Sequence, residues 1–246
     1  MADRDAERRI VAVARRQAGA WSRGQALECR VGDGLIRVRR QQGAWASPES
    51  GVFVAASAPS SLLRSCWVAH LAAGLASVVS HEAAATLWGL SIDKPRVVVT
   101  MPHGYHPRLR LATVCQSRDL DTSMVRQLAG LALTNPARTI LDLAAVLSVD
   151  ALGRLLAEAT TLQVVRLAEV QSLAHQLSFS GRPGMGRVAR VLDERGPGNT
   201  PPASELERMF QRLVRAAGLP EGKGQAALRG RDGRAHVVDA CMKPRW

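Results

Sequence analysis

The sequence lacks the features that mark disulfide-rich, zinc-binding or membrane-spanning proteins. Its four cysteines are far apart and form no Cys-x-x-Cys pair, so neither a disulfide framework nor a zinc knuckle is predicted. No apolar run reaches the roughly 18 residues of a membrane span, and the first residues do not resemble a signal peptide. We therefore expect a cytoplasmic protein with no membrane association, cofactor or metal.

Lysine is also scarce, since only three of the 33 basic residues are lysines and the rest are arginines. Such a bias often accompanies a GC-rich bacterial genome, so the number of arginines alone says little about function. The net charge of +12 still favours a polyanionic partner. This surplus is uneven: it is +4 over residues 1–60, +2 over residues 61–180 and +6 over residues 181–246. The two ends are therefore the candidates for contacting nucleic acid.

A short basic helix is predicted over residues 33–42, directly before an aromatic hairpin. Asp33 suits the N-cap of this helix, and Gly43 suits the position after its last turn. Leu35 and Val38 lie three residues apart and would form a narrow apolar stripe that anchors the helix. In the major groove of DNA, arginine can contact guanine and glutamine can contact adenine. The predicted base-contacting residues are Arg37, Arg40 and Gln41.

The residues around this helix supply the other parts of a winged helix-turn-helix domain over residues 1–56. A helical pattern over residues 6–16 precedes a capping box formed by Ser22 and Gln25, and residues 45–54 would form the wing. This order of elements is the one that a helix-turn-helix requires. The expected partner is double-stranded DNA. Contacts to its phosphates, which fix the register without reading the sequence, are expected from Arg23, Arg30 and Arg39.

Two other interpretations of this region are open. It could be a small three-helix packing unit whose arginines are merely solvated, because runs of charge usually face solvent. It could also be an interaction scaffold that binds protein. A salt-dependent affinity for DNA would argue against both interpretations.

The middle of the chain, residues 57–195, predicts a helix-rich α+β domain, so the fold class of the whole protein is α+β. Hydrophobic periodicity predicts helices and short apolar or alternating runs predict strands. The expected helices cover residues 61–76, 80–90, 137–147, 149–160, 166–178 and 184–194. The expected strands cover residues 95–101 and 108–116, joined by a turn.

Several side chains of this domain invite a catalytic or metal-binding interpretation. His81 is followed by a glutamate, but adjacent helical residues point about 100° apart, so a structural role is expected. His103 and His106 have no evident third ligand, and we expect both in an exposed loop. Arg138 and Asp142 are four residues apart and are predicted to pair along one face of a helix.

Five short sequence motifs, taken together and in this order, resemble those of the AbiEi-type antitoxin proteins of bacterial type IV toxin–antitoxin systems. They are Trp45 with Gly51-Val52-Phe53, Ser80-His81 to Trp88-Gly89-Leu90, Val97-Val98-Val99-Thr100, Arg118-Asp119-Leu120, and Thr134-Asn135-Pro136-Ala137-Arg138-Thr139-Ile140-Leu141-Asp142-Leu143-Ala144. The resemblance covers residues 5 to about 195. It implies a winged helix that represses the promoter of its own operon and a following domain with antitoxin action. A cognate nucleotidyltransferase-like toxin is the second partner that it implies.

Residues 196–202 form the clearest linker of the chain, because they are rich in glycine and proline. The segment after it, residues 203–246, resembles the opening of the very-short-patch-repair-like endonucleases of the PD-(D/E)xK superfamily. By that resemblance Glu205 matches the acidic residue of the helix, and Asp239 matches the first metal-binding aspartate. The elements expected here are a helix over residues 204–217 and two strands, over residues 226–229 and 235–240, with an Asp-Gly turn between them.

Metal-assisted hydrolysis of a phosphodiester needs several oxygen ligands and a group that activates water. In the nuclease family these come from an acidic strand downstream of the position of Asp239, and no such strand follows it in this sequence. We therefore expect that the protein has no catalytic site and is not an enzyme. Asp239 and Glu205 would then be vestigial residues. A DNA endonuclease remains the alternative function.

Overall fold

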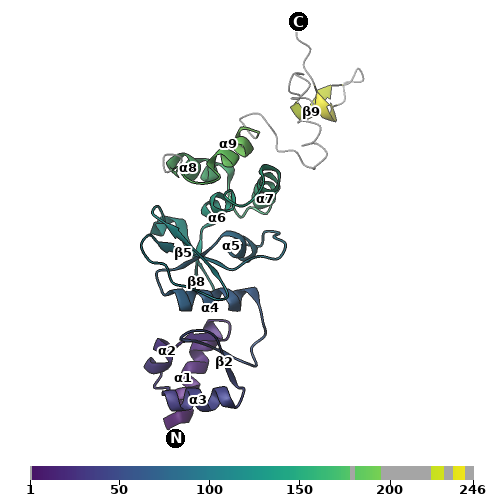
Figure 1. Ribbon diagram of the computed structural model, residues 1–246. Coiled ribbons are helices and arrows are strands. Elements are labelled where there is room, and N and C mark those ends of the chain that lie inside the picture. Colours follow the sequence, from purple (N-terminus) through teal and green to yellow (C-terminus); the bar gives the residue numbers. More distant parts are fainter. Residues whose placement is uncertain (1, 178–180, 195–222, 230–234, 242–246) are drawn as a thin grey trace. The chain divides into compact units, whose positions relative to one another are not determined.

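The computed structural model describes residues 2–177, 181–194, 223–229 and 235–241 of the chain, which is drawn in Figure 1. The described residues form both helices and sheets, and each sheet contains antiparallel strand pairs, which confirms the α+β class. The chain divides into two compact units, residues 1–185 and 186–246. Within the described part of the chain, no helix is long and apolar enough to cross a membrane.

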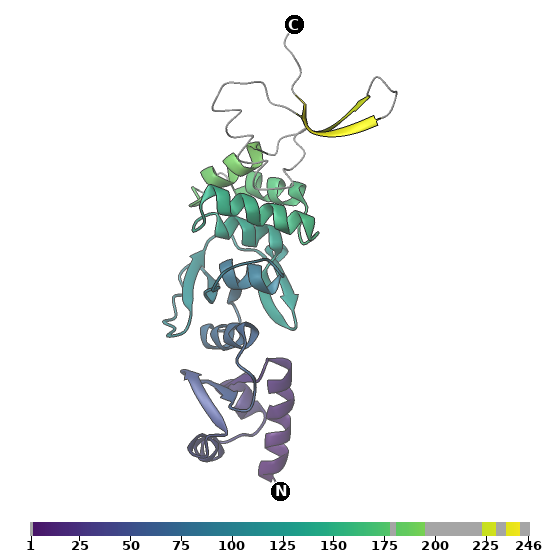
Figure 2. The ribbon, with the colours of Figure 1, turned by 90° about the vertical axis from the view of Figure 1, so that its right-hand side faces the viewer.

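The first elements, which we call the head (residues 2–56), include the predicted helices and hairpin in the predicted order, together with one short strand that was not predicted. They are α1 (Ala2–Arg16), β1 (Ala20–Ser22), α2 (Arg23–Glu28), α3 (Asp33–Gln41), β2 (Trp45–Glu49) and β3 (Val52–Ala55). The strands form an antiparallel sheet in the order β1-β3-β2, and Figure 2 shows them from the side with α1 in purple. The capping box of Ser22 and Gln25 is present, as predicted. Asp33 is not the N-cap of α3, because Gly32 occupies that position and Asp33 lies in the first turn.

The apolar face of α3 differs from the predicted one. Ile36 is buried, Leu35 is half-buried, and Val38 is 41% exposed. Ile36 belongs to a core that contains Ile10 of α1 and Trp21 of β1. The sequence predicted that Leu35 and Val38 anchor the helix. In the structure, the packing of α3 against α1 and the sheet instead centres the buried face on Ile36. Val38 is left on the surface of the helix.

The next elements, which we call the body (residues 61–177 and 181–185), surround a five-stranded sheet. Its strands are β4 (Val78–Ser80), β5 (Val98–Pro102), β6 (Thr113–Ser117), β7 (Val125–Leu128) and β8 (Leu131–Thr134), in the order β6-β5-β4-β8-β7. The β5–β6 and β4–β8 pairs are parallel, and the β4–β5 and β7–β8 pairs are antiparallel. The sequence predicted only β5 and β6, and β6 is shorter than the predicted range.

Helices of the body agree closely with the predicted ranges. They are α4 (Leu62–Ala73), α5 (His81–Leu87), α6 (Pro136–Leu143), α7 (Val149–Thr161) and α8 (Leu167–Leu177), with a short 3₁₀ turn η1 (Thr122–Met124). Asn135 caps α6 by accepting a hydrogen bond from the Arg138 amide, and Pro136 occupies its first turn, where a missing N–H costs nothing. Both α4 and α5 contact β4 and β5, so helices cover the middle of the sheet.

One of the two hydrophobic clusters of the first unit contains residues of both head and body. Val52 and Val54 of β3 belong to the cluster that contains Trp67 of α4, while Phe53 between them belongs to the core of the head. This division follows the alternation of side chains along a strand. Glu49 of β2 is buried, and its Oε1 accepts hydrogen bonds from the backbone amides of residues 110 and 111, both at 2.7 Å. The hairpin of the head is therefore fixed to the body.

We expect Glu49→Ala to lower the free energy of unfolding by about 1–3 kcal/mol, because two amides lose a charged acceptor. Urea denaturation of the full chain measures the change, with Ser50→Ala, at an exposed position of the same turn, as the control. A loss that is no larger than in the control would mean that this contact does not hold the hairpin in solution.

In the second unit the structure describes α9 (Met185–Asp193, whose first residue belongs to the first unit), β9 (Lys223–Arg229) and β10 (Ala235–Cys241). The two strands pair antiparallel, which confirms the predicted hairpin, although β9 begins three residues earlier than expected. The predicted linker, the predicted helix over residues 204–217 and Glu205 lie outside the described residues.

Candidate functional site

A groove of about 850 Å³ lies between α3 and the β2–β3 hairpin. The three residues predicted to contact bases, Arg37, Arg40 and Gln41, all line it and are all exposed. Their spacing of three and four positions places them on one face of the helix. The hairpin contributes Trp45, Ala46, Ser47 and Phe53 to the facing wall. In the described structure none of the three predicted base-contacting side chains has a hydrogen bond or an ion pair.

The predicted phosphate-contacting arginines have different surroundings. Arg39 points away from the groove, where Nη2 donates to Glu7 Oε2 at 2.9 Å and Nη1 donates to Gln42 Oε1 at 2.9 Å. The hydrogen bond and charge of Glu7 raise the pKa of Arg39. Arg23 lines the groove and pairs with Asp33 at 2.7 Å. Arg30 is exposed in the loop before α3, in the left-handed conformation with φ of 61°.

The hairpin is held in place by aromatic packing under the groove. The rings of Trp21 and Trp45 meet edge to face with centroids 5.0 Å apart, and Phe53 lies 6.3 Å from Trp21. Trp21 and Phe53 are buried and Trp45 is half-buried. These contacts pack the hairpin onto the core of the head.

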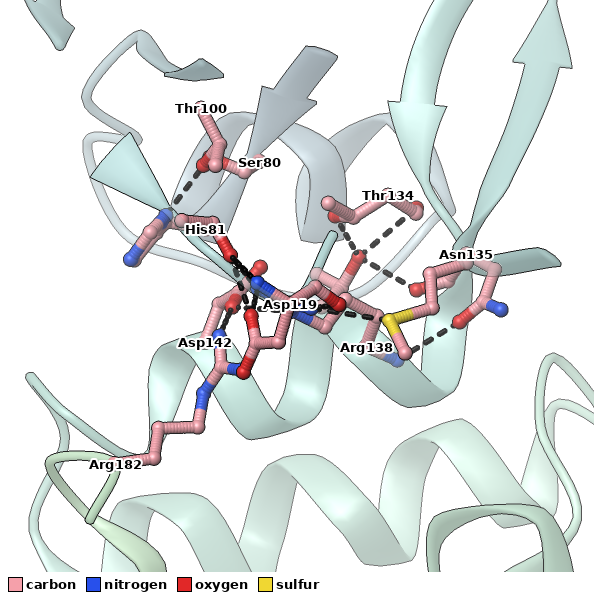
Figure 3. A network of polar contacts seen from close by, with 12 residues as sticks. Ser80, His81, Thr100, Asp119, Thr134, Asn135, Arg138, Asp142 and Arg182 are labelled. Atoms are coloured by element: carbon pink, nitrogen blue, oxygen red, sulfur yellow. Dashed lines mark hydrogen bonds and ion pairs between the residues drawn. The ribbon is translucent and has the colours of Figure 1, made fainter. Parts of the chain in front are cut away.

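A second polar site is the network of charges in the body, drawn in Figure 3. Arg138 is completely buried, and its Nε donates to Asp142 Oδ1 at 2.9 Å, which confirms the predicted pair. Its Nη2 donates to Asp119 Oδ1 at 3.1 Å and to Ser117 Oγ at 2.9 Å. Its Nη1 contacts the Asp119 carbonyl oxygen at 3.4 Å and the sulfur of Met124 at 3.0 Å. All three nitrogens of this guanidinium therefore have partners.

Arg182 completes the network from a distant part of the sequence. Its Nη1 lies 2.8 Å from Asp119 Oδ2 and its Nη2 lies 2.6 Å from Asp142 Oδ1. Two arginines and two aspartates thus alternate around one ring of ion pairs. The sequence does not reveal Arg182 and Asp119 as members of this ring, because no local spacing connects residues that are 63 positions apart.

Burial alone would raise the pKa of Asp119, but the Ser117 hydroxyl and the charges of Arg138 and Arg182 outweigh it and lower the pKa below its ordinary value of 3.8. A carboxyl whose pKa is lower in the folded state contributes stability above the unfolded pKa, and this contribution is lost as the pH falls through the lower folded value. We therefore expect the free energy of unfolding to fall more steeply below pH 3.8 in the wild type than in Asp119→Asn. Urea titrations between pH 3 and 7 measure both curves. Equal slopes would contradict the role of Asp119.

His81 lies beside this network, at the start of α5, with a left-handed φ of 54°. Its Nδ1 is 2.8 Å from the Ser80 hydroxyl, which accepts a hydrogen bond from Thr100 Oγ1 at 2.8 Å. Burial lowers the pKa of His81, although the charges of Asp142 and Glu82 oppose the effect. Glu82 binds Arg96 instead, through contacts of 2.6 and 3.0 Å. As expected, His81 and Glu82 therefore do not form a joint site.

A cavity of about 670 Å³ opens beside the network. Among the residues that line it are His81, His103, Arg118, Arg138 and Arg182, together with both aspartates of the ring. His103 lies in the loop after β5 and is exposed, as predicted, and so is His106. In the part of the chain that the structure describes, no group of three or more His, Cys, Asp or Glu residues could hold a metal ion. Asp239 lies in β10, and Glu205 is outside the described residues, so their expected vestigial role stays a prediction.

No protein-family profile and no curated protein sequence matches the chain. Among solved structures, the chain is similar to the crystal structure of the RV2827C protein from Mycobacterium tuberculosis. The two sequences are 20% identical, the TM-score is 0.48, and the match covers 78% of this chain and 77% of that chain.

Proposed function

We propose that the protein is a DNA-binding transcriptional regulator with a winged helix-turn-helix head. In this proposal α3 is the recognition helix and enters the major groove, and the β2–β3 hairpin is the wing. The observation that carries the proposal is the groove in which Arg37, Arg40 and Gln41 are exposed on one face of α3. A guanidinium that has no partner in the described structure can contact guanine without first breaking an ion pair.

The remaining arginines take different parts in the proposed complex. Arg30 is exposed in the loop that precedes the recognition helix, and we assign it a phosphate contact, which positions the helix without reading bases. Arg39 is engaged by Glu7, so we now assign it mainly to holding α3 against α1. Arg23 would have to give up its ion pair with Asp33 in order to contact a phosphate.

This assignment predicts different salt dependences for two matched variants. Affinity for a fragment of the protein's own promoter is measured by fluorescence anisotropy at several salt concentrations. Arg30→Gln should reduce the slope of log K against log salt by about one unit, because one released counterion is lost. Arg39→Gln should leave that slope nearly unchanged. If wild-type protein shows no salt-dependent binding, the proposed function is wrong; if only Arg39→Gln changes the slope, the two assignments are exchanged.

By its resemblance to AbiEi-type proteins, we also propose that the chain acts as the antitoxin of a type IV system against a nucleotidyltransferase-like toxin. Because head and body share a core, removing residues 1–56 would strip the body of packing partners such as Val52 and Val54. The better test is the full chain with Arg37→Ala and Arg40→Ala. This variant should lose repression and retain neutralisation of a toxin encoded beside it; loss of both activities in a folded variant would contradict separate roles.

A further inference from the structure

The cavity of the body holds more positive charge than its aspartates neutralise. Three arginines line it, Arg118, Arg138 and Arg182, against the two carboxylates of Asp119 and Asp142. Both aspartates already pair with Arg138 and Arg182. The charge of Arg118 is therefore left without a carboxylate among the described residues.

The environment of Arg118 suits an anion. Its Nη2 lies 3.2 Å from His103 Nε2, and this is the one hydrogen bond of its side chain within the described part of the protein. In that contact the imidazole nitrogen is the acceptor, and it brings no negative charge to balance the guanidinium. An incoming anion would take the place of the imidazole nitrogen as acceptor, and a guanidinium binds phosphate oxygens through two parallel hydrogen bonds. Arg118 is exposed at the mouth of the cavity, so a ligand can reach it.

A second polar group of the same cavity lacks a partner. Asp142 is 4% exposed, and its Oδ1 accepts from both Arg138 and Arg182. Its Oδ2 is buried without a hydrogen-bond partner in the described structure. Buried carboxylate oxygens are normally paired, because an unmade hydrogen bond is costly. Asp142 lines the cavity, and a ligand N–H or O–H group would reach this buried oxygen after a movement of the surrounding side chains.

We propose that this cavity is a binding site for a small phosphate ester, with the phosphate at Arg118 in place of the His103 contact and a hydrogen-bond donor of the ligand directed at Asp142. The volume of about 670 Å³ lies within the usual range for small-molecule sites. The aspartates of the ring disfavour a long polyanion, which would bring further phosphates next to carboxylates. The ligand class is therefore a compact molecule with one phosphorylated end and one donor-bearing end, such as a nucleoside monophosphate or a sugar phosphate.

Calorimetric titration of the full chain tests this site, with the four nucleoside 5′-monophosphates, glucose 6-phosphate, inorganic phosphate and unphosphorylated nucleosides as probes. At least one phosphate ester should bind, and more tightly than inorganic phosphate or the matching unphosphorylated compound. Arg118→Gln should weaken its binding by about tenfold or more, the loss expected from one charge-assisted contact. Arg166→Gln, which removes an exposed arginine from outside the cavity, should bind as the wild type does. A thermal melt shows whether each variant is folded. His103→Ala, which removes the competing acceptor of Arg118, serves as the second variant and should bind the ester at least as tightly as the wild type.

Four results would overturn the proposal. The first is that none of the esters binds at millimolar concentration, and the second is that a folded Arg118→Gln variant binds the ester as tightly as the wild type. The third is that a carboxylate such as glutamate binds equally tightly, and the fourth is that an oligonucleotide displaces the bound ester. The last result would assign the cavity to a nucleic-acid surface. None of these measurements depends on the promoter, so the site and the proposed DNA-binding function can fail separately.

Discussion

Arg138→Met is expected to lower the free energy of unfolding by about 3–5 kcal/mol, the cost of removing one partner from a buried ion pair. Arg138 is completely buried, and its loss leaves Asp142, which is 4% exposed, and Asp119 with only Arg182 to balance two negative charges. Methionine retains the apolar part of the arginine side chain, so the change removes chiefly the guanidinium with its charge and hydrogen bonds.

Urea denaturation at pH 7 measures this loss, with Arg166→Met at an exposed position as the matched control. The loss should shrink when Asp142→Asn is combined with Arg138→Met, because the charge left behind is then removed. Similar stabilities for Arg138→Met and the control would show that the ring of ion pairs contributes nothing to folding.

The second large effect concerns DNA. Arg37→Ala and Arg40→Ala should each weaken binding to a specific promoter site by about 1–3 kcal/mol if each guanidinium contacts a base. The two side chains have no partner in the described structure, so neither substitution should reduce the stability of the head. Fluorescence anisotropy with the promoter fragment and with a scrambled duplex of equal length gives the two affinities.

The comparison of the two duplexes decides the role of these arginines. Loss of a base contact should weaken binding to the specific site much more than binding to the scrambled duplex. Loss of a phosphate contact should weaken binding to both duplexes equally. Arg166→Ala is the control for the loss of one positive charge. If the double variant binds the specific site as the wild type does, α3 is not the recognition helix.

Local signals accounted for most helices of this protein. The capping box of Ser22 and Gln25 predicted the start of α2, and the expected helix over residues 137–147 matches α6, which Asn135 caps. The separation of four residues between Arg138 and Asp142 predicted their ion pair. These signals work because a helix and its caps are built from contacts within a few residues, so the sequence contains both partners side by side.

Strands of the body were harder to predict. The missed strands β4, β7 and β8 have only three or four residues each, too few to establish an alternating pattern. Their pairing joins distant segments, such as Val79 with Leu133. A strand of this kind is defined by its neighbours in the sheet, which the local sequence does not contain.

By itself the sequence determined the α+β class, the positions of most helices and the exposed polar face of α3. Only the tertiary structure decided that Ile36 rather than Val38 anchors that helix, because the buried side is set by the packing of α1 and Trp21. It also brought Asp119 and Arg182 together across 63 positions. Hydrogen bonds and caps of helices form between near neighbours in the chain, whereas burial and charge networks depend on which distant segments the fold places in contact.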